Sequence, residues 1–332
     1  MKILLVRLSS LGDLVYVTSI LEALHHHGHE IHLLTDQTFA DLFLGDPRLR
    51  RLWQIDRKAL RQTLPAVLSS LQEEAFDFAV DLHKKPVTQW VVRRVQAKRV
   101  LSIQKRSLRR RLRVWFRCPM RPWHIVEWYA EPLIHAGLMT GPLPQPSIQT
   151  PPLSDLPFSL PPHFLVLAPE ASHPAKEWPH FRALAETLHR TWSTPVVVVG
   201  THPDPPGYPG IDLRGKTNLR QLVEIIRRSE GVIANDSGPA HLAAAAGKPL
   251  IVFFGPTVPD MGFRPWGNPW LRIFERPYGC RPCSLHGSRL CRFSFPSRCL
   301  ADIPPEEVLH VLQSLPTFTI RGPDPERRQE KP

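Results

Sequence analysis

The sequence predicts an α/β protein built from two doubly wound domains with parallel sheets, and three observations favour this. Apolar, strand-like runs alternate with helix-like segments in both halves of the chain. Between Gly141 and Pro162, eight of 22 residues are proline, which is typical of a stiff connector. The length of 332 residues is too great for one comfortable core. We expect an N-terminal domain over 1–145, a linker over 146–162, a C-terminal domain over 163–318 and a disordered tail over 319–332.

The N-terminal half opens with a short apolar run, which predicts a buried strand over 3–8. The next segment spaces its apolar residues for one face of a helix over 14–24. Further apolar runs predict strands over 30–35, 76–82 and 100–103. Arg7 interrupts the first run after four residues, which excludes a signal peptide, and no run approaches the roughly 18 residues of a membrane span. We therefore expect a cytoplasmic protein without a membrane anchor of its own.

The C-terminal half repeats this alternation of short apolar runs and amphipathic segments. Because open α/β sheets bind ligands beyond the carboxyl ends of their strands, the loops that follow the strands are the candidates for ligand binding. Two such halves joined by a linker also predict a ligand cleft between domains. The predicted strands are 164–168, 195–200 and 231–234, and the predicted helices are 178–192, 219–229 and 303–315.

The stretch from Ile233 to Phe254 predicts a buried strand, a polar turn, an Ala-rich helix and a second buried strand. Its turn, Asp236-Ser237-Gly238-Pro239, can cap the helix, with proline tolerated in the first turn. A helix N-terminus at the end of a parallel strand suits a phosphate group, and His241 lies on the first turn. An ordinary capped βαβ unit is the alternative interpretation.

The loop from Arg7 to Asp13 joins the first predicted strand to the first helix. Asp13 falls at the helix start, where an aspartate often serves only as a cap. The functional alternative is a carboxylate at the mouth of the cleft that accepts a proton as a general base.

The loop from Ala168 to Pro179 follows the first predicted strand of the second half. Prolines bracket Lys176 in this loop, and Ser172 and His173 add possible hydrogen-bond donors. A lysine before a helix is usually only solvated. A fixed ammonium can instead neutralise charge that develops on a leaving phosphate.

The positive charge of the chain is concentrated in one segment. Residues 82–126 contain 14 Lys and Arg and no Asp or Glu, which leaves −2 for the rest of a chain whose net charge is +12. Such a segment attracts nucleic acid, an anionic membrane or a phosphorylated substrate, unless it is merely a solvated helix. Nucleic acid is disfavoured because aromatic residues are few and no RNA-binding signature occurs. The densest part is Lys105 to Arg117, in which Trp115 and Phe116 are interleaved.

The segment Gly210-Ile-Asp-Leu-Arg-Gly-Lys-Thr217 matches the spacing of a phosphate-binding P-loop. A P-loop needs a long buried strand before its first glycine, whereas 201–209 contains four prolines. We interpret Gly215 to Thr217 as the approach to the next helix. A P-loop kinase or ATPase is therefore a weaker alternative.

Four of the five cysteines lie within 20 residues, and Cys118 stands apart. A C-x-x-C pair followed by two more thiols could bind structural zinc. Disulfides and free thiols are the alternatives, although a reducing cytoplasm disfavours disulfides. The four cysteines are Cys280, Cys283, Cys291 and Cys299.

Taken together, the ordered motifs resemble bacterial glycosyltransferases of family 9, the heptosyltransferases of lipopolysaccharide core assembly. The resemblance runs along nearly the whole chain. The residues that carry it are Leu5-Val-Arg-Leu-Ser-Ser-Leu-Gly-Asp-Leu14, Pro174-Ala-Lys-Glu-Trp-Pro179, Asn235-Asp-Ser-Gly-Pro-Ala-His241, Phe254-Gly-Pro-Thr257 and the cysteine segment up to Asp302.

The resemblance implies a GT-B architecture, with two Rossmann-like domains facing across a cleft. It implies an inverting transfer of heptose from an ADP-activated donor, with the N-terminal domain binding the acceptor and the C-terminal domain binding the nucleotide sugar. Asp13 would be the general base. The donor diphosphate would be bound by Ser172, Lys176, Asp236, Ser237, Gly238 and His241.

The same resemblance implies an acceptor that is a phosphorylated lipid saccharide of the Kdo-lipid A type at the cytoplasmic face of the inner membrane. We expect peripheral contact with that membrane, a monomer, no nucleic-acid partner and no cofactor. The absence of a D-x-D sequence accords with a metal-independent mechanism. The residues implied in acceptor binding are Gly12, Arg109, Arg110, Arg111, Arg113 and Arg117.

Overall fold

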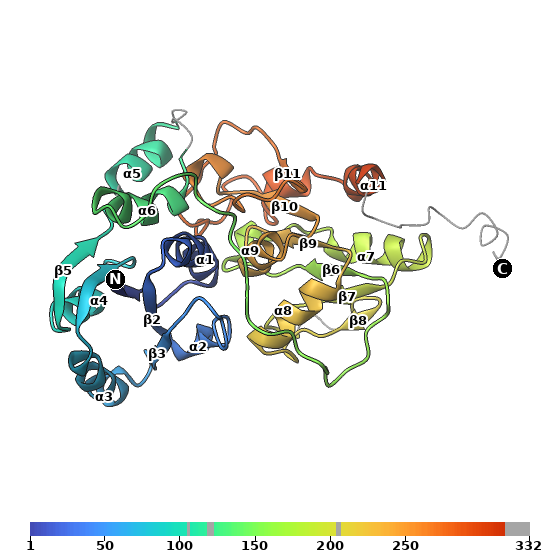
Figure 1. Ribbon diagram of the computed structural model, residues 1–332. Helices are drawn as coiled ribbons and strands as arrows, with labels where there is room; N and C mark the ends of the chain where they lie inside the picture. Colours follow the sequence, from blue (N-terminus) through green and yellow to red (C-terminus); the bar gives the residue numbers. More distant parts are fainter. Residues whose placement is uncertain (105–106, 118–122, 204–206, 316–332) are drawn as a thin grey trace, which may run out of the picture. The chain divides into compact units, whose positions relative to one another are not determined.

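A computed structural model describes residues 1–104, 107–117, 123–203 and 207–315, without the side chains of Ser107 and Arg109 (Figure 1). It divides into two compact units. The first comprises Met1–Arg106 and Trp123–Pro152, and the second comprises Ser107–Pro122 and Leu153–Pro332. The proline-rich stretch 141–163 contains no helix or strand. The predicted tail and Cys118 lie outside the described residues.

The first unit contains one parallel sheet with the strand order β3-β2-β1-β4-β5. β1 lies at its centre and is paired with β2 on one side and with β4 on the other. The strands are β1 (Lys2–Val6), β2 (Glu30–Asp36), β3 (Arg51–Ile55), β4 (Phe76–Asp81) and β5 (Ala97–Ser102), and the helices are α1 (Leu11–His26), α2 (Gln37–Ala40), α3 (Leu60–Glu73), α4 (Pro86–Val92) and α6 (Ile125–His135).

The second unit contains a parallel sheet with the order β11-β10-β9-β6-β7-β8. Its central pair is β6 and β9, in register from Leu165 and Gly231 to Ala168 and Ala234. The strands are β6 (Leu165–Ala168), β7 (Val196–Val198), β8 (Ile211–Asp212), β9 (Gly231–Asn235), β10 (Leu250–Phe254) and β11 (Leu271–Glu275). The helices are α5 (Ser107–Phe116), α7 (Phe181–Arg190), α8 (Leu219–Arg228), α9 (Gly238–Ala245), α10 (Arg298–Ala301) and α11 (Pro305–Ser314), with short 3₁₀ turns η1 (Pro174–Lys176) and η2 (Pro259–Met261).

Both sheets reverse their strand order beside the first strand of the unit, between β1 and β4 and between β6 and β9. This is the topological switch point of a doubly wound sheet, where ligands bind beyond the carboxyl ends of the strands. The predicted fold class is confirmed, and the predicted strands around both switch points are present. The loops after β1, β6 and β9 are those that the sequence singles out.

The structure contradicts the alternative of a P-loop at residues 210–217. Ile211 and Asp212, which would lie inside a phosphate loop, form β8 and pair with β7. Asn218 caps α8, so the segment from Gly215 leads into that helix as expected. Several elements were not predicted, namely β3, β8, β11, helices α2 to α6 and helix α10.

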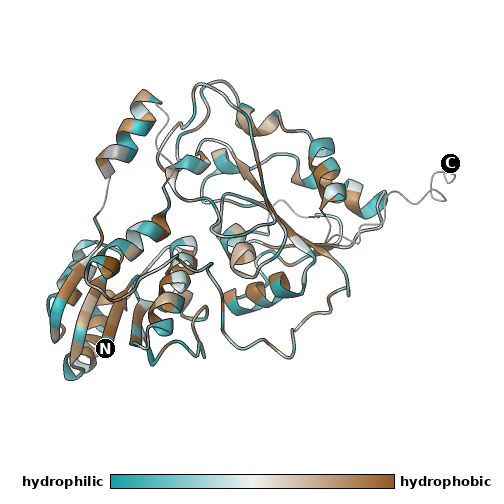
Figure 2. Ribbon diagram, turned by 45° about the horizontal axis from the view of Figure 1, so that its top comes forward, coloured by the Kyte–Doolittle hydropathy of each residue, from teal (hydrophilic) through white to brown (hydrophobic). Residues whose placement is uncertain are grey.

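The central strands supply the buried core of each unit. All four apolar residues of β1 from Ile3 to Val6 are fully buried, and hydrophobic colour follows the strands in Figure 2. In the second unit Phe253 of β10 stacks on Trp178 with a centroid separation of 4.2 Å. Within the described residues, no helix combines the length and the apolar character that a membrane crossing requires.

We predict that Phe253→Ala destabilises the second unit by about 3–5 kcal/mol, because it removes a fully buried ring and leaves a cavity beside Trp178. Phe293→Ala is the control, since that ring is 67% exposed and its loss should change stability by about 0.5 kcal/mol or less. Urea denaturation measures both. Equal effects of the two substitutions would contradict this description of the core.

Candidate active site

Two loops of the second unit meet at its switch point. The loop after β6 leads through Pro169 to η1, and β9 ends at Asn235. The Asn235 side-chain oxygen accepts a hydrogen bond from the Trp178 backbone N–H at 2.9 Å. Its amide nitrogen donates to the Pro169 carbonyl at 2.6 Å. One fully buried amide therefore fastens the lysine-bearing loop to the end of β9.

Lys176 and Asp236 form a buried ion pair beside that junction. Their Nζ and Oδ2 atoms are 2.7 Å apart, and each side chain is 10% exposed. The Thr257 hydroxyl donates to the same carboxylate oxygen at 2.9 Å. Asp236 therefore fixes the Lys176 ammonium in place. An anion bound at Lys176 would contact the same ammonium as Asp236.

The N-terminus of α9 begins next to this pair. Ser237 occupies the N-cap position, Gly238 is the first helical residue, and Pro239 follows within the first turn. The Ser237 hydroxyl oxygen is buried and, among the described residues, is without a hydrogen-bond partner. Buried polar atoms are normally paired, so this hydroxyl is available to a group that approaches the helix end. His241 is buried on the same helix, and Ser172 is exposed in the loop after β6.

A second loop packs against the stem of Lys176 from the cysteine segment. A Cβ added at Gly287 would lie 2.5 Å from Lys176 Cγ, and the φ of Gly287 is +75°. The same segment is tied to the end of β10, because the Cys283 backbone N–H donates to the Pro256 carbonyl at 2.8 Å. The cysteine segment thus limits where the Lys176 side chain can lie.

Arg281 reinforces this attachment. Its guanidinium is buried and donates to the carbonyls of Phe254 at 3.0 Å and Thr257 at 2.9 Å, and also to that of Gly255. Glu275 neutralises it at 2.8 Å. Hydrogen bonds from this one arginine side chain therefore hold the loop that carries Thr257.

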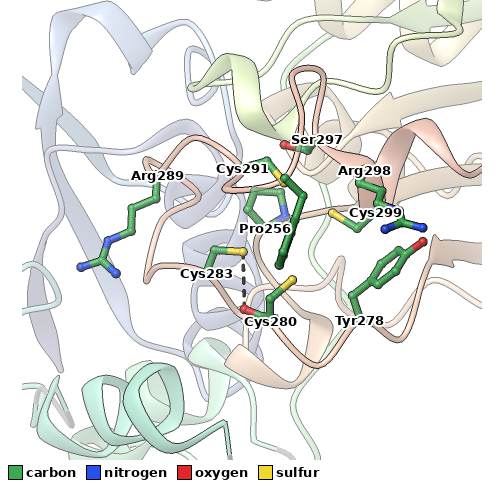
Figure 3. A pocket seen from close by; sticks show the side chains of 10 residues that line it. Pro256, Tyr278, Cys280, Cys283, Arg289, Cys291, Ser297, Arg298 and Cys299 are labelled. Carbon is green, nitrogen blue, oxygen red and sulfur yellow. Dashed lines mark hydrogen bonds between the residues drawn. The ribbon is translucent and has the colours of Figure 1, made fainter.

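The four cysteines of this segment surround one cavity of about 110 Å³ (Figure 3). All four thiols are free, so the structure contains none of the disulfides considered from the sequence. Within the described ranges, no three His, Cys, Asp or Glu side chains form a group that could hold a metal ion. Burial raises the pKa of Cys299 to about 11, which keeps this thiol protonated and unreactive at neutral pH.

Asp13 lies on the first turn of α1 at the switch point of the first unit, one residue after Gly12. Arg7 Nη2 is 2.5 Å from its Oδ2, and the Tyr129 hydroxyl of α6 donates to its Oδ1 at 2.6 Å. The Ser10 backbone N–H and hydroxyl also donate to Oδ2, at 3.2 and 2.8 Å. The carboxylate thus belongs to the capping box at the start of α1, and three residues orient it.

These contacts determine the charge state of Asp13. Burial alone would raise the pKa of this carboxyl group. The positive charge of Arg7 and the hydrogen bonds from Tyr129 and Ser10 outweigh burial, so the pKa of Asp13 lies below its ordinary value. Asp13 is therefore ionised at neutral pH, with its side chain 16% exposed.

The arginines of the basic segment lie in different surroundings. Arg113 is paired with Asp260 at 2.9 Å, and Arg110 lies over the Phe263 ring at 4.6 Å. Arg111 and Arg117 are exposed. The side chain of Arg109 lies outside the described residues.

Several side chains that build these sites were not chosen from the sequence. Arg7, Asn235 and Thr257 lie inside the quoted motifs, so the motifs themselves contained the signal. Tyr129 carried none, because it is 116 residues from its partner Asp13. Gly287 and Arg281 act through packing and backbone contacts that no local pattern reveals.

Comparison with known proteins identifies relatives for most of the chain. A family model described as glycosyltransferase family 9 (heptosyltransferase) matches residues 65–292. The lipooligosaccharide heptosyltransferase 2 of Haemophilus influenzae is 40% identical over 102 residues, which cover 26% of this chain and 29% of that protein. The lipopolysaccharide heptosyltransferase 1 of Pseudomonas aeruginosa is 25% identical over 313 residues, which cover 85% and 86%. The chain thus matches less than a third of the length of the more similar relative.

Solved structures show the same fold. The ADP-heptose lipopolysaccharide heptosyltransferase II of E. coli superposes with a TM-score of 0.72 at 22% identity, covering 95% of this chain and 98% of that one. The iron-containing dodecameric glycosyltransferase TibC from enterotoxigenic E. coli superposes with a TM-score of 0.59 at 16% identity, covering 95% and 78%. The similarity confirms the GT-B architecture.

We predict that Gly287→Ala lowers the free energy of unfolding by about 1–3 kcal/mol, because a Cβ there meets Lys176 and the backbone is left-handed. Gly279→Ala is the matched control in the same segment, where a Cβ meets no atom within 4 Å. Thermal and urea unfolding compare the two. If Gly287→Ala is as stable as the control, the segment does not confine Lys176.

Proposed function

The chain belongs to glycosyltransferase family 9, and we propose that it is an inverting glycosyltransferase that moves heptose from an ADP-activated donor to a phosphorylated lipopolysaccharide-core acceptor of the Kdo-lipid A type. The names of its relatives support a heptosyl transfer, and the E. coli structure of the same fold is that of an ADP-heptose enzyme. The single observation that carries the proposal is the buried ion pair of Lys176 and Asp236 directly before the N-terminus of α9.

The donor diphosphate would lie at the N-terminus of α9. Ser237 would donate its hydroxyl to a phosphate oxygen, and the partial positive charge of the helix end favours the anion. Gly238 lets the diphosphate approach closely, His241 would lie beside it, and Ser172 would be a further contact. Asp236 would act through Lys176, because a carboxylate repels phosphate but can position the ammonium.

The chemistry breaks the bond between the anomeric carbon and the diphosphate while the acceptor oxygen forms a new bond on the opposite face. Negative charge builds on the departing diphosphate, where Lys176 and the helix end can stabilise it without a metal ion. The acceptor hydroxyl would give its proton to Asp13, which is ionised and therefore able to receive it. A low pKa makes Asp13 a weak base, so proton transfer would accompany bond formation, when the acceptor oxygen becomes acidic.

The two units would divide the substrates between them. The first unit, with Asp13 and Gly12, would bind the acceptor, and the second unit would bind the nucleotide sugar. The exposed arginines Arg111 and Arg117, which belong to the second unit, also suit an anionic acceptor. We further propose a metal-independent monomer that acts at the cytoplasmic face of the inner membrane by peripheral contact.

We expect the protein to release ADP when it is given ADP-heptose and Kdo-lipid A. Asp13→Asn should lower kcat/KM by about 10²–10⁴-fold through loss of the base. Lys176→Met should lower it by about 10²-fold or more through loss of charge stabilisation. Coupled detection of ADP measures both.

Lys216→Met is the matched control for Lys176→Met, because Lys216 is an exposed lysine of the discarded P-loop pattern. It should keep the wild-type rate. Loss of activity in Lys216→Met with retention in Lys176→Met would reverse the assignment. Thermal protection by other ADP-sugars and by UDP-sugars distinguishes heptose transfer from use of another donor.

The pH dependence offers a separate check on Asp13. Its carboxylate must be unprotonated to act, so kcat/KM falls only when the pH drops through its lowered pKa. Tyr129→Phe removes a hydrogen bond that lowers this pKa, and the acid limb of the profile should therefore move to higher pH. Tyr208→Phe in the second unit should leave the limb in place. If the acid limb of the kcat/KM profile stays at the same pH in Tyr129→Phe, ionisation of Asp13 does not determine that limb.

A further inference from the structure

Helix α5 is fixed to the second unit by one of its faces. Arg113 pairs with Asp260 of η2 at 2.9 Å, with its side chain 10% exposed. Arg110, one turn earlier, places its guanidinium 4.6 Å from the centre of the Phe263 ring. Two arginines of the basic segment therefore point toward the protein and hold the helix in place.

The other side of α5 presents large apolar side chains to solvent. Leu108, Trp115 and Phe116 are 66%, 65% and 68% exposed, and Leu112 is 40% exposed. At about 100° per residue these four positions fall within an arc of about 100° on the helix. Soluble monomers rarely gather large apolar side chains in this way unless the patch contacts something.

Positive charge accompanies this apolar row. Arg111 is exposed on the helix and Arg117 is exposed directly after it. The surrounding sequence from Leu82 to Val126 contains no acidic residue. A short helix with Leu, Trp and Phe on one side, Arg111 next to them and Arg117 directly after its end has the composition of an interfacial helix on an anionic bilayer.

We propose that α5 is the membrane-docking element of this protein. Its row of Leu108, Leu112, Trp115 and Phe116 enters the interfacial region of an anionic bilayer, and Arg111 and Arg117 contact lipid phosphates. This deepens the proposed function, on which it rests, because a lipid-linked acceptor is presented at such a surface. The bilayer suits the row better than nucleic acid does, since Arg110 and Arg113 are turned inward and the outward face is mainly apolar.

The test uses the full-length chain and flotation with vesicles of phosphatidylglycerol and phosphatidylethanolamine. The wild type should float with these vesicles and bind phosphatidylcholine vesicles several-fold more weakly. The double variant Trp115→Ser/Phe116→Ser should bind the anionic vesicles about tenfold more weakly or worse, because burial of even one large side chain is worth that much. Its melting temperature should not change, since both rings are exposed.

Phe293→Ser is the matched control, because its ring is as exposed as that of Phe116 but lies outside α5. It should float like the wild type. The proposal is overturned if the double variant binds as the wild type does, or if Phe293→Ser loses as much binding. It is also overturned if the two α5 substitutions abolish DNA binding or dimer formation while vesicle binding is absent in the wild type.

Assays with a vesicle-embedded acceptor and with a water-soluble acceptor distinguish a failure of membrane docking from a failure of the proposed transfer reaction. The double variant should lose ADP release with acceptor embedded in vesicles and keep the wild-type rate with a deacylated, water-soluble acceptor. Equal loss with both acceptors would place Trp115 and Phe116 in acceptor recognition and contradict membrane docking. A wild type that transfers to neither acceptor but still floats through α5 would refute the proposed function and leave the docking element standing.

Discussion

The buried side-chain amide of Asn235 joins the two loops on which the candidate donor site depends. β6 and β9 pair through their backbones only as far as Ala168 and Ala234, and beyond that point their loops are free to diverge. Asn235 closes this gap with one accepted and one donated hydrogen bond. Because its amide is wholly buried, losing either partner would leave a polar group unpaired at a cost of about 1–3 kcal/mol. With this junction closed, Lys176 pairs with Asp236 at 2.7 Å.

Each unit places a carboxylate against a cation at its switch point, with different consequences. In the second unit the carboxylate of Asp236 restrains Lys176, so the cation is held ready rather than solvated. In the first unit the cation Arg7 serves the carboxylate, keeping Asp13 ionised and oriented. A fixed arrangement of charges needs little reorganisation during a reaction, which is how such sites stabilise developing charge.

Some arginines of the basic segment make contacts within the protein, and others are exposed to solvent. Arg113 neutralises Asp260, and Arg110 lies over the ring of Phe263, so these two residues attach α5 to the second unit. The exposed arginines are Arg111 on α5 and Arg117 directly after it, and the large apolar side chains of the same helix are also exposed. Net charge counted along the sequence therefore overstates the charge available to a partner.

The sequence predicted the central strands because parallel strands covered on both sides are continuous apolar runs, as in β1 and β10. It missed β3 and β11 because edge strands carry charged residues such as Arg51 and Glu275, and it missed β8 because two residues make no pattern. Motif order likewise located Asp13, Lys176 and the start of α9. Those residues lie in the connections between a strand and the helix or turn that follows it, where local sequence motifs are recognisable.

What the sequence by itself determined is the parallel α/β class, the loops that meet at each switch point and the family. Only the tertiary structure decided that Tyr129 holds Asp13, that Asn235 joins two loops, and that α5 turns its apolar residues outward. The physical reason is that periodicity and capping act within a few residues, whereas these contacts join segments dozens of residues apart. Their partners are selected by packing, which no local pattern records.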